Sequence, residues 1–374
     1  MAKRKRKKFG VLKAVISFVV LVAVIAAAFI AIKCEGDLSW DNIERTVKNL
    51  SAGVRSAETF EFGSADGAVF GDTGGGIVKI TETSVTAYSS AGDELYTERL
   101  RLSKPAVHSC AGRSAVFGSG DTDVRAFDKS GLMYSLTAEY PVISATMSPG
   151  GKTALCTLED GWNGSVTVYG ISGAAEYKWY CASGYPSVAA VSKDGGRLAV
   201  LLFGSEGGEI VLLKTDSEKE QARLSLGETI ALDMRFMDNG SLAVITENGI
   251  ISVGTDGGVA DEYSFEGKNL LMYDMGSGDM TLAVLEDFPG GPAEIVSVSS
   301  ACREIGRISA EKDVVGLSAS EQKTAVLYRG MAVICKKDLT AEVSLIKDGA
   351  EKIFMRADGS ALVLDSYLAE KLES

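Results

Sequence analysis

Short runs of alternating apolar and polar residues, separated by glycine-rich turns, fill most of the chain after its first 58 residues. Alternation with a period of two is typical of β-strands that bury one face. It is clear at 124–128, where Val124 and Ala126 alternate with Arg125 and Phe127. The pattern therefore predicts an all-β body of short strands and excludes a solenoid of stacked helices.

The turns between these strands repeat with a period of about 40 residues. One class leads from an apolar run into a strand of small and apolar residues, and it lies at positions 74, 112, 150, 195, 240, 278, 321 and 359. A second class joins alternating strands, and it lies at positions 92, 131, 173, 217, 257, 301 and 339. Each repeat thus holds two hairpins and four strands, which is the blade of a β-propeller.

The number of turns predicts how the ring closes. Eight turns of the first class stand against seven of the second, so the last blade lacks its fourth strand. The segment TFEFG at 59–63 precedes the first blade and has no partner of its own. We expect it to complete an eighth blade, with Phe60 and Phe62 packed between the first and last blades. A seven-bladed ring is the alternative, if one of these blades is split or the last hairpin is irregular.

The N-terminal region has a different pattern. Residues 14–32 are apolar with a single exception, and as a helix they would extend about 28 Å, close to the thickness of the hydrocarbon core. The block KRKRKK at 3–8 precedes them, and positive charge beside a span stays cytoplasmic. We expect a basic cytoplasmic leader at 1–13, a transmembrane helix at 14–33 and an extracytoplasmic body. A cleaved signal peptide is the alternative, although the apolar stretch is longer than its usual core.

Residues 34–56 connect this predicted anchor to the body. Apolar residues recur at helical spacing between Trp40 and Leu50, which predicts a short amphipathic helix. That helix can lie on the membrane surface or pack on the body. The propeller domain is expected at 57–374.

Several of the turns resemble those of known propeller families. MSPGGKTAL, VSKDGGRLAV and MRADGSALVL resemble the Ser-Pro-Asp-Gly-Lys turn of WD40-like repeats, and VRAFDKSGLMYSL resembles a hairpin of quinoprotein-like repeats. With its basic leader and apolar segment, the chain is similar to an uncharacterised family of membrane-anchored propellers from clostridia and related Gram-positive bacteria. The resemblance covers roughly residues 59–366 and implies the fold, but says almost nothing about activity.

Charge narrows the range of partners. The chain of 374 residues carries 38 basic and 50 acidic residues, a formal net charge of −12. Eight of the basic residues and no acidic residue lie in the first 33 positions, so the remainder carries −20. An acidic body argues against a nucleic-acid-binding protein.

Candidate chemistry is sparse. His108 is the only histidine, and we expect it on an inner strand of the second blade, facing the central channel as a structural residue. Only Trp162 and Trp179 lie in the propeller, so the quinoprotein resemblance does not carry its quinone cofactor. The segment GDTGGG at 71–76 lacks the following Lys-Ser/Thr of a phosphate loop and is interpreted as a hairpin turn.

Other polar motifs are also interpreted structurally. The oxygen-rich loops at 120–128 and 159–164 do not have the register of a calcium loop, and we expect solvated turns. Asn163 and Asn239 begin Asn-Gly-Ser sequences that are typical of tight turns. The five cysteines of the body are expected to be mostly reduced and buried: Cys110, Cys156, Cys181, Cys302 and Cys335.

The sequence therefore predicts no catalytic, cofactor-binding or metal-binding residue. The leading hypothesis is a membrane-tethered propeller that binds a protein, peptide or cell-envelope ligand. The alternative is a carboxylate-dependent hydrolase or lyase with its site in the central channel. Three or more converging acids with a bound cation would favour the enzyme, whereas neutral and apolar channel walls would favour the scaffold.

Overall fold

The computed structural model describes residues 20–22, 24–25, 28–29, 58–205, 207–276, 278–310 and 313–373. The chain divides into two compact units, Met1–Ser51 and Ala52–Ser374, which are described separately. In the first unit the described residues are helical. No helix within the described residues is long and apolar enough to cross a membrane. Most of the span predicted at 14–33, and all of the amphipathic helix predicted between Trp40 and Leu50, lie outside those residues.

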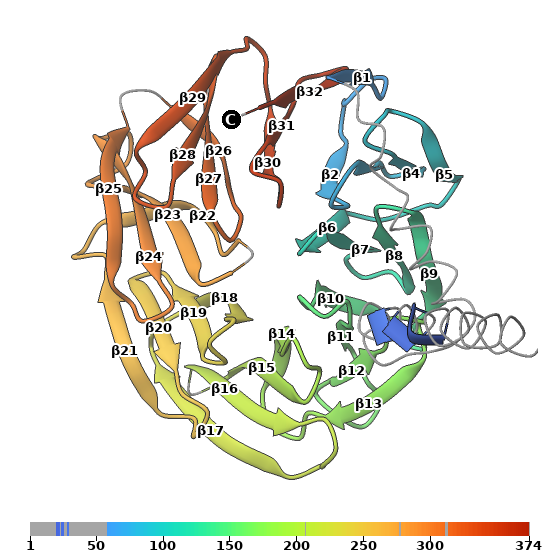
Figure 1. The fold of residues 1–374 in the computed structure, drawn as a ribbon. Coiled ribbons are helices and arrows are strands. Elements are labelled where there is room, and N and C mark those ends of the chain that lie inside the picture. Colours follow the sequence, from blue (N-terminus) through green and yellow to red (C-terminus); the bar gives the residue numbers. More distant parts are fainter. Residues whose placement is uncertain are drawn as a thin grey trace, which may run out of the picture. The chain divides into compact units, whose positions relative to one another are not determined.

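The described residues of the second unit form 32 strands in eight four-stranded antiparallel sheets. The sheets stand side by side around a central axis, as the blades of a propeller (Figure 1). The predicted all-β, eight-bladed fold is therefore confirmed, and the seven-bladed alternative is wrong.

Within each blade the strands follow one another in chain order from the axis outward, except that β1 is the outermost strand of blade 8. The innermost strands of blades 1 to 8 are β2 (Val69–Asp72), β6 (Pro105–Cys110), β10 (Val142–Met147), β14 (Tyr185–Val191), β18 (Ala231–Phe236), β22 (Asn269–Asp274), β26 (Val314–Ala319) and β30 (Lys352–Met355). The second strands are β3 (Ile77–Ile80), β7 (Arg113–Gly118), β11 (Thr153–Thr157), β15 (Arg197–Gly204), β19 (Leu242–Thr246), β23 (Met280–Glu286), β27 (Lys323–Tyr328) and β31 (Ala361–Leu364).

The outer half of each blade follows the same order. The third strands are β4 (Val85–Tyr88), β8 (Asp123–Asp128), β12 (Ser165–Tyr169), β16 (Gly207–Lys214), β20 (Gly249–Val253), β24 (Ala293–Ser299), β28 (Met331–Lys336) and β32 (Leu368–Leu372). The outermost strands are β5 (Glu94–Glu98), β9 (Gly131–Thr137), β13 (Ala175–Tyr180), β17 (Glu220–Gly227), β21 (Val259–Ser264), β25 (Glu304–Ala310), β29 (Ala341–Ile346) and β1 (Thr59–Glu61).

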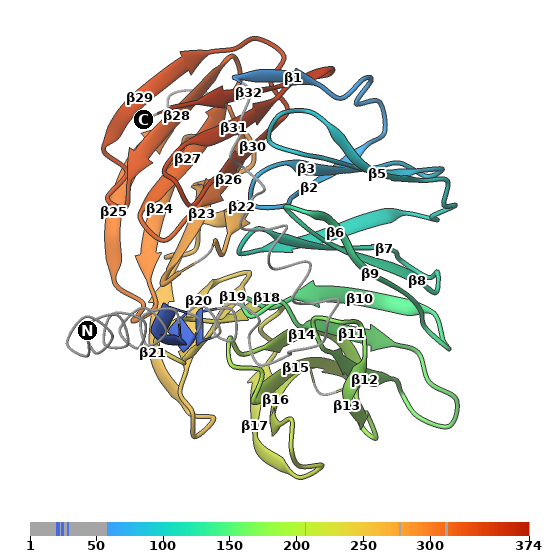
Figure 2. The same ribbon diagram turned by 45° about the vertical axis from the view of Figure 1, so that its right-hand side comes forward.

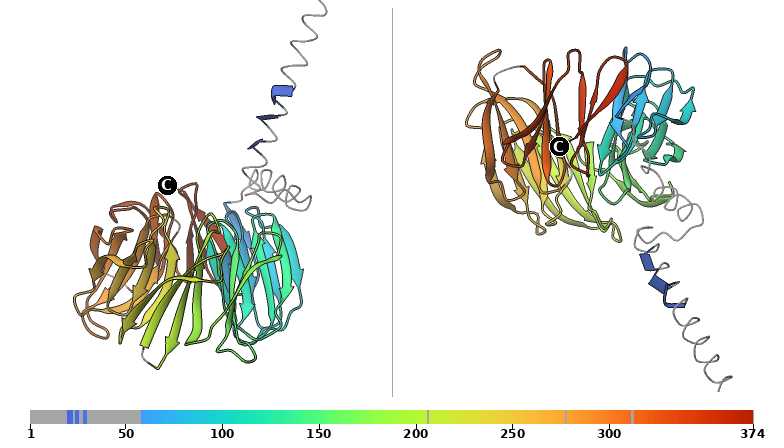
Figure 3. Two further views of the ribbon diagram at one scale, coloured as in Figure 1. Left: turned by 90° about the horizontal axis from the view of Figure 1, so that it is seen from below. Right: turned by 45° about the horizontal axis from the view of Figure 1, so that its top comes forward.

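This strand order gives the propeller two different ends. The hairpin turns between first and second strands, and between third and fourth strands, lie at one end, which we call the turn end. The connections between second and third strands, and those leading to the next blade, lie at the other end, which we call the loop end. Figure 3 shows the ring edge-on, with the strands running between these ends. Both predicted classes of turn lie at the turn end.

The ring closes through its N-terminal strand, as predicted. β1 pairs antiparallel with β32, so that Phe60 lies opposite Ala369, and the two strands lie side by side in Figures 1 and 2. Phe60 and Phe62 are buried between blades 8 and 1. The Phe60 ring lies 6.4 Å from that of Tyr88, and the Phe62 ring lies 5.0 Å from that of Phe70. Two distant parts of the chain thus share one blade without a covalent link.

One detail of the predicted alternation is wrong. In β8 every residue from Val124 to Asp128 is buried, not only one face. The reason is that both faces of this middle strand are covered, since Val124 and Ala126 pack in the cluster shared with blade 3 and Phe127 packs in the cluster shared with blade 1. Arg125 is accommodated there because its guanidinium pairs with Glu98 of blade 1 at 2.8 Å.

Candidate functional site

Charged side chains occur on the innermost strands, around the axis. They are Asp72, His108, Asp233, Arg235, Asp274 and Lys352, together with Arg356 directly after β30. His108 lies on β6 of the second blade, as predicted. Its Nδ1 accepts a hydrogen bond of 3.0 Å from the Met147 backbone N–H, so in the neutral ring the proton is on Nε2.

Burial governs the protonation of these charged side chains around the axis, which we call the axial group. It lowers the pKa of His108 and raises the pKa of Asp233, while the charges of these two residues act on each other in the opposite direction. Burial also raises the pKa values of Asp72 and Asp274. The strands β2, β6, β18 and β22 therefore carry groups that are biased towards their neutral forms.

Two arginines near the axis have incomplete hydrogen bonding. Arg235 is buried and donates to the Gly278 carbonyl of the next blade, but its Nε has no partner among the described residues. Arg356 is also buried, and no described residue pairs with its Nε or Nη2. Nearby, Asp72 Oδ1 likewise has no partner in the described part of the chain. The axis thus combines both signs of charge, and the described residues contain no group of acids, histidine or cysteines that could hold a metal ion.

The two ends of the propeller differ sharply in exposed apolar side chains. Among the described residues, nine large exposed hydrophobic side chains lie at the loop end: Leu158, Trp162, Tyr180, Tyr185, Phe203, Ile230, Phe288, Ile346 and Tyr367. Six of these are aromatic. In the described part of the propeller, only Leu95 and Val259 are large exposed hydrophobic side chains at the turn end, while Leu232 and Leu271 lie within the inner strands β18 and β22. Aromatic side chains are enriched at the centres of protein interfaces, so the loop end is the candidate binding surface.

The turn end is built differently. Neighbouring hairpins approach at backbone distance: a Cβ added to Gly112 would lie 2.6 Å from the Gly74 Cα, and one added to Gly150 would lie 2.1 Å from the Lys193 carbonyl oxygen. The Asp238 N–H also donates to Asp279 of the next blade at 2.8 Å. These contacts hold adjacent blades together.

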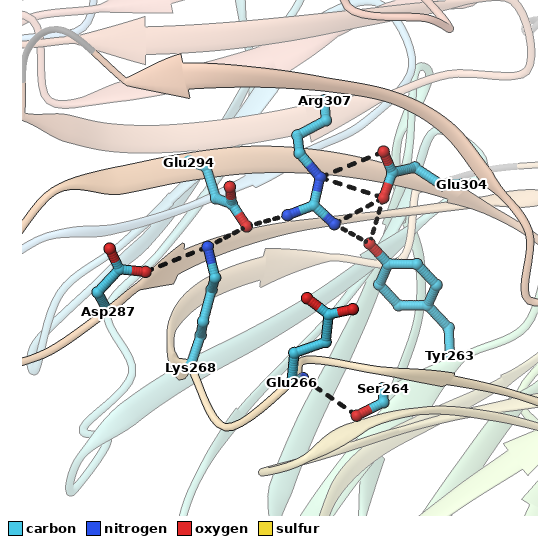
Figure 4. Close-up of polar contacts among 8 residues, drawn as sticks. All are labelled: Tyr263, Ser264, Glu266, Lys268, Asp287, Glu294, Glu304 and Arg307. Atoms are coloured by element: carbon cyan, nitrogen blue, oxygen red, sulfur yellow. Dashed lines mark hydrogen bonds and ion pairs between the residues drawn. The ribbon is translucent and has the colours of Figure 1, made fainter.

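A polar network also joins the outer strands of blades 5 and 6 (Figure 4). Arg307 on β25 pairs with Glu304 at 2.7 Å and also contacts Glu294. The same guanidinium donates to the hydroxyl of Tyr263 on β21 at 2.8 Å. Lys268, between the two blades, contacts Glu294 at 2.9 Å. Since these charges are paired with one another, the network supports the inter-blade seam and leaves little capacity for a ligand.

The motifs considered in the sequence have structural roles. Residues 71–76 end β2 and form its hairpin turn, with the Thr73 N–H bonded to the Gly76 carbonyl. In the loop at 159–164, Glu159 accepts from Lys178 at 2.8 Å and from Ser165 at 2.9 Å. In the segment at 120–128, the acidic oxygens accept from backbone and side-chain donors of the protein.

The tryptophans separate into two roles, and the cysteines share one. Trp179 is buried, whereas Trp162 is exposed at the loop end. All five body cysteines are buried, and they form no disulfide within the part of the chain that the structure describes. Burial raises the pKa of Cys156 and of Cys181 to about 12, so both remain unreactive thiols at neutral pH.

Sequence reasoning did not identify the loop-end aromatic residues as a group. Their signal is position: Trp162 stands in a Gly-rich loop, while Tyr185 and Phe288 directly precede prolines. Combined with the blade boundaries, aromatic residues in these connections could have indicated an exposed surface.

Comparisons with known proteins support the fold. The model of a family described as "Family of unknown function (DUF5711)" matches residues 48–266. A comparison with curated protein sequences finds no match.

Solved propellers resemble the chain in structure but hardly in sequence. The C-terminal WD40 domain of Sif2 superposes with a TM-score of 0.60 at 10% identity, covering 84% of this chain and 97% of that domain. BamB from Moraxella catarrhalis gives 0.55 at 10% identity, with 85% and 99% covered. Kuenenia stuttgartiensis hydrazine synthase gives 0.50 at 12% identity, with 72% and 94% covered. At identities this low the likeness shows a shared fold and carries no information about activity.

Proposed function

The chain belongs to the DUF5711 family, whose function is unknown, and we propose that it is a membrane-tethered β-propeller that binds a protein, peptide or cell-envelope ligand on its loop end. The observation that carries this proposal is the uneven distribution of exposed apolar side chains, nine at the loop end against two at the turn end of the described propeller. Scattered exposed hydrophobic residues are normal, but their concentration on one face is typical of an interaction surface.

The membrane location is part of the same proposal. It is supported by the basic block at 3–8 and the apolar stretch at 14–32. The described residues between 20 and 29 are helical, apolar and exposed, as expected of side chains that face lipid. With the leader in the cytoplasm, the propeller would lie outside the cell membrane and meet its ligand there.

The test compares the two ends with matched substitutions in the full-length chain. The loop-end variant is Tyr185→Ser with Phe288→Ser, and the turn-end variant is Leu95→Ser with Val259→Ser, so each removes two exposed apolar side chains. A partner is identified by crosslinking in intact cells, purified, and its affinity for each protein is measured in detergent. We expect the loop-end variant to bind at least tenfold more weakly and the turn-end variant to bind as the wild type does. The reverse ranking would contradict the proposal.

The axial group favours a second candidate function, a carboxylate-dependent hydrolase or lyase. Burial raises the pKa values of Asp72, Asp233 and Asp274, and a carboxylic acid with a raised pKa can act as a proton donor. The innermost strands β10, β14 and β26 carry no charged residue, and the described residues contain no cluster of acids that could hold a metal. Turnover of a hydrolase substrate that is lost in Asp233→Asn and retained in the loop-end variant would establish this function instead.

A further inference from the structure

We propose that the loop end of blades 3 and 4 binds a segment of the partner in which a lysine or arginine stands beside apolar side chains. The proposal deepens the function proposed above and rests on it. The site, which we call the aromatic–acidic patch, consists of Glu139, Tyr140, Asp160, Trp162, Tyr180 and Tyr185. Four of these residues lie in the connection before β10 or in the one between β11 and β12, and Tyr180 and Tyr185 are the strand residues on either side of the connection between β13 and β14.

The backbone beneath the aromatic–acidic patch is held in place. The Asn163 N–H donates to the Cys181 carbonyl at 3.0 Å, and the Cys181 N–H donates to the Gly164 carbonyl at 2.9 Å. A Cβ added to Gly164 would lie 2.7 Å from the ring of Pro186, so the two loops approach closely. A surface ordered before binding loses little conformational entropy when a ligand arrives.

Its aromatic rings are exposed and close together. The rings of Trp162 and Tyr180 lie 5.3 Å apart, with an angle of 32° between their planes. Trp162 is 48% exposed and Tyr185 is 60% exposed. Rings of this kind offer apolar area and a negative face that attracts cations.

The patch also carries uncompensated negative charge. Burial raises the pKa of Tyr140, and three nearby carboxylates raise it further. They belong to Asp160, Glu139 and Glu159. Of these, Glu159 is paired with Lys178, whereas no ion pair within the described residues involves Glu139 or Asp160, and both are exposed. The surface around the aromatic rings is therefore suited to a positive group.

The molecule itself contains an example of the recognition we infer. The ammonium of Lys178 lies 4.8 Å from the centre of the Tyr180 ring and 2.8 Å from Glu159, between an aromatic face and a carboxylate. Trp162 and Asp160 offer the same pair of groups in the same loop without an internal cation among the described residues. A partner's lysine or arginine would take this place, and its apolar neighbours would contact Tyr185. Exposed aromatic rings also suit sugars, but the unpaired acids favour a cation.

A peptide selection tests the proposal directly. The full-length chain in detergent micelles is used as bait for a phage library of random twelve-residue peptides, and the most enriched peptide is synthesised. Its affinity is measured by fluorescence anisotropy for the wild type, Trp162→Ala, Asp160→Asn and the turn-end control Val259→Ala. We expect enrichment of lysine or arginine beside apolar residues. Affinity should fall at least tenfold in the first two variants, fall severalfold as salt rises from 50 to 500 mM, and stay within twofold in the control.

Other outcomes separate this inference from the proposed function. Peptides that lack basic residues, or no enrichment at all, would overturn the inference, as would binding of chitotetraose that depends on Trp162. Peptides whose binding is lost only in Phe288→Ala or Tyr367→Ala would overturn the inference while leaving the loop end as the binding surface. Peptides unaffected by every loop-end substitution would contradict both. Trp162→Phe keeps an aromatic ring and should retain most of the affinity. If Trp162→Phe also loses affinity, the circular dichroism spectra of both variants decide the reading. Spectra that differ from that of the wild type would attribute the loss in Trp162→Ala to misfolding, and matching spectra would count against the role of the aromatic ring.

Discussion

The turn end and the loop end of the propeller are made from the same strands, yet they differ in what they expose. At the turn end neighbouring hairpins approach so closely that Gly150 has no room for a side chain beside Lys193. At the loop end the connections carry exposed aromatic residues such as Tyr185, Phe288 and Tyr367. The turn end therefore holds neighbouring blades together, and we propose that the loop end contacts a partner.

The largest effect should come from adding one methyl group at each end. A Cβ at Gly76, in the turn of blade 1, would lie 1.7 Å from the Tyr88 carbonyl oxygen, whereas at Gly204, at the loop end, the nearest atom is 3.8 Å away. We expect Gly76→Ala to lower the free energy of unfolding by about 3 kcal/mol or more, and Gly204→Ala to change it by less than about 0.5 kcal/mol. Denaturant unfolding monitored by circular dichroism measures both. Equal losses would mean that the turn end is not specially packed.

Two phenylalanines sharpen the comparison within the loop end. Phe62, just after β1, is 3% exposed in the seam between blades 8 and 1, whereas Phe203 is 37% exposed. Phe62→Ala should cost about 3–5 kcal/mol because it leaves a cavity beside the blade that β1 completes by pairing with β32. Phe203→Ala should cost less than half as much. If the two costs in unfolding free energy were alike, the seam would not hold the ring closed.

A third contrast separates charge from packing. Arg125 lies between the ends, and its hydrogen bonds lower the pKa of Glu98. The pair therefore stabilises the fold fully above the ordinary glutamate pKa of 4.5, and this contribution is lost as the pH falls through the lowered value. We expect Arg125→Met to cost about 2 kcal/mol at pH 7, since Glu98 is partly exposed. The difference from the wild type should shrink below pH 4.5, and a difference that is constant with pH would contradict this account.

The smallest effect on stability is expected in the aromatic–acidic patch. Trp162→Ala and Tyr185→Ala remove side chains that are about half exposed, so each should change the free energy of unfolding by less than about 0.5 kcal/mol. Thermal unfolding of these variants beside the wild type provides the measurement. A large loss in either variant would show that these rings support the fold instead of being available to a partner.

The fold could be predicted from the sequence because each propeller repeat depends on local patterns of turn residues and short strands. Turn residues such as Gly240 and Gly359, with φ of 85° and 88°, recur along the chain and mark many of the hairpins. The closure was predictable because an orphan strand and a missing strand implied each other. The burial of both faces of β8 was not predictable from alternation, since it depends on neighbouring blades.

The candidate site was harder to foresee. The folding of two hairpins brings together Trp162, Tyr180 and Tyr185, which are separate in the sequence. The residue type alone also does not show whether a tyrosine is exposed or buried. His108 was placed on the correct strand from its apolar neighbours. Its position near Asp233 of blade 5 depends on how the ring curves, which local sequence does not specify.

The most direct test of the central claim, that the loop end is the binding surface, is site-specific photocrosslinking in intact cells. A benzophenone amino acid is introduced in place of Tyr185 or Phe288 at the loop end, and in place of Val259 at the turn end, three exposed positions. The account predicts crosslinked adducts of the same partner from both loop-end positions and none from the turn-end position. Adducts formed only in place of Val259 would contradict it.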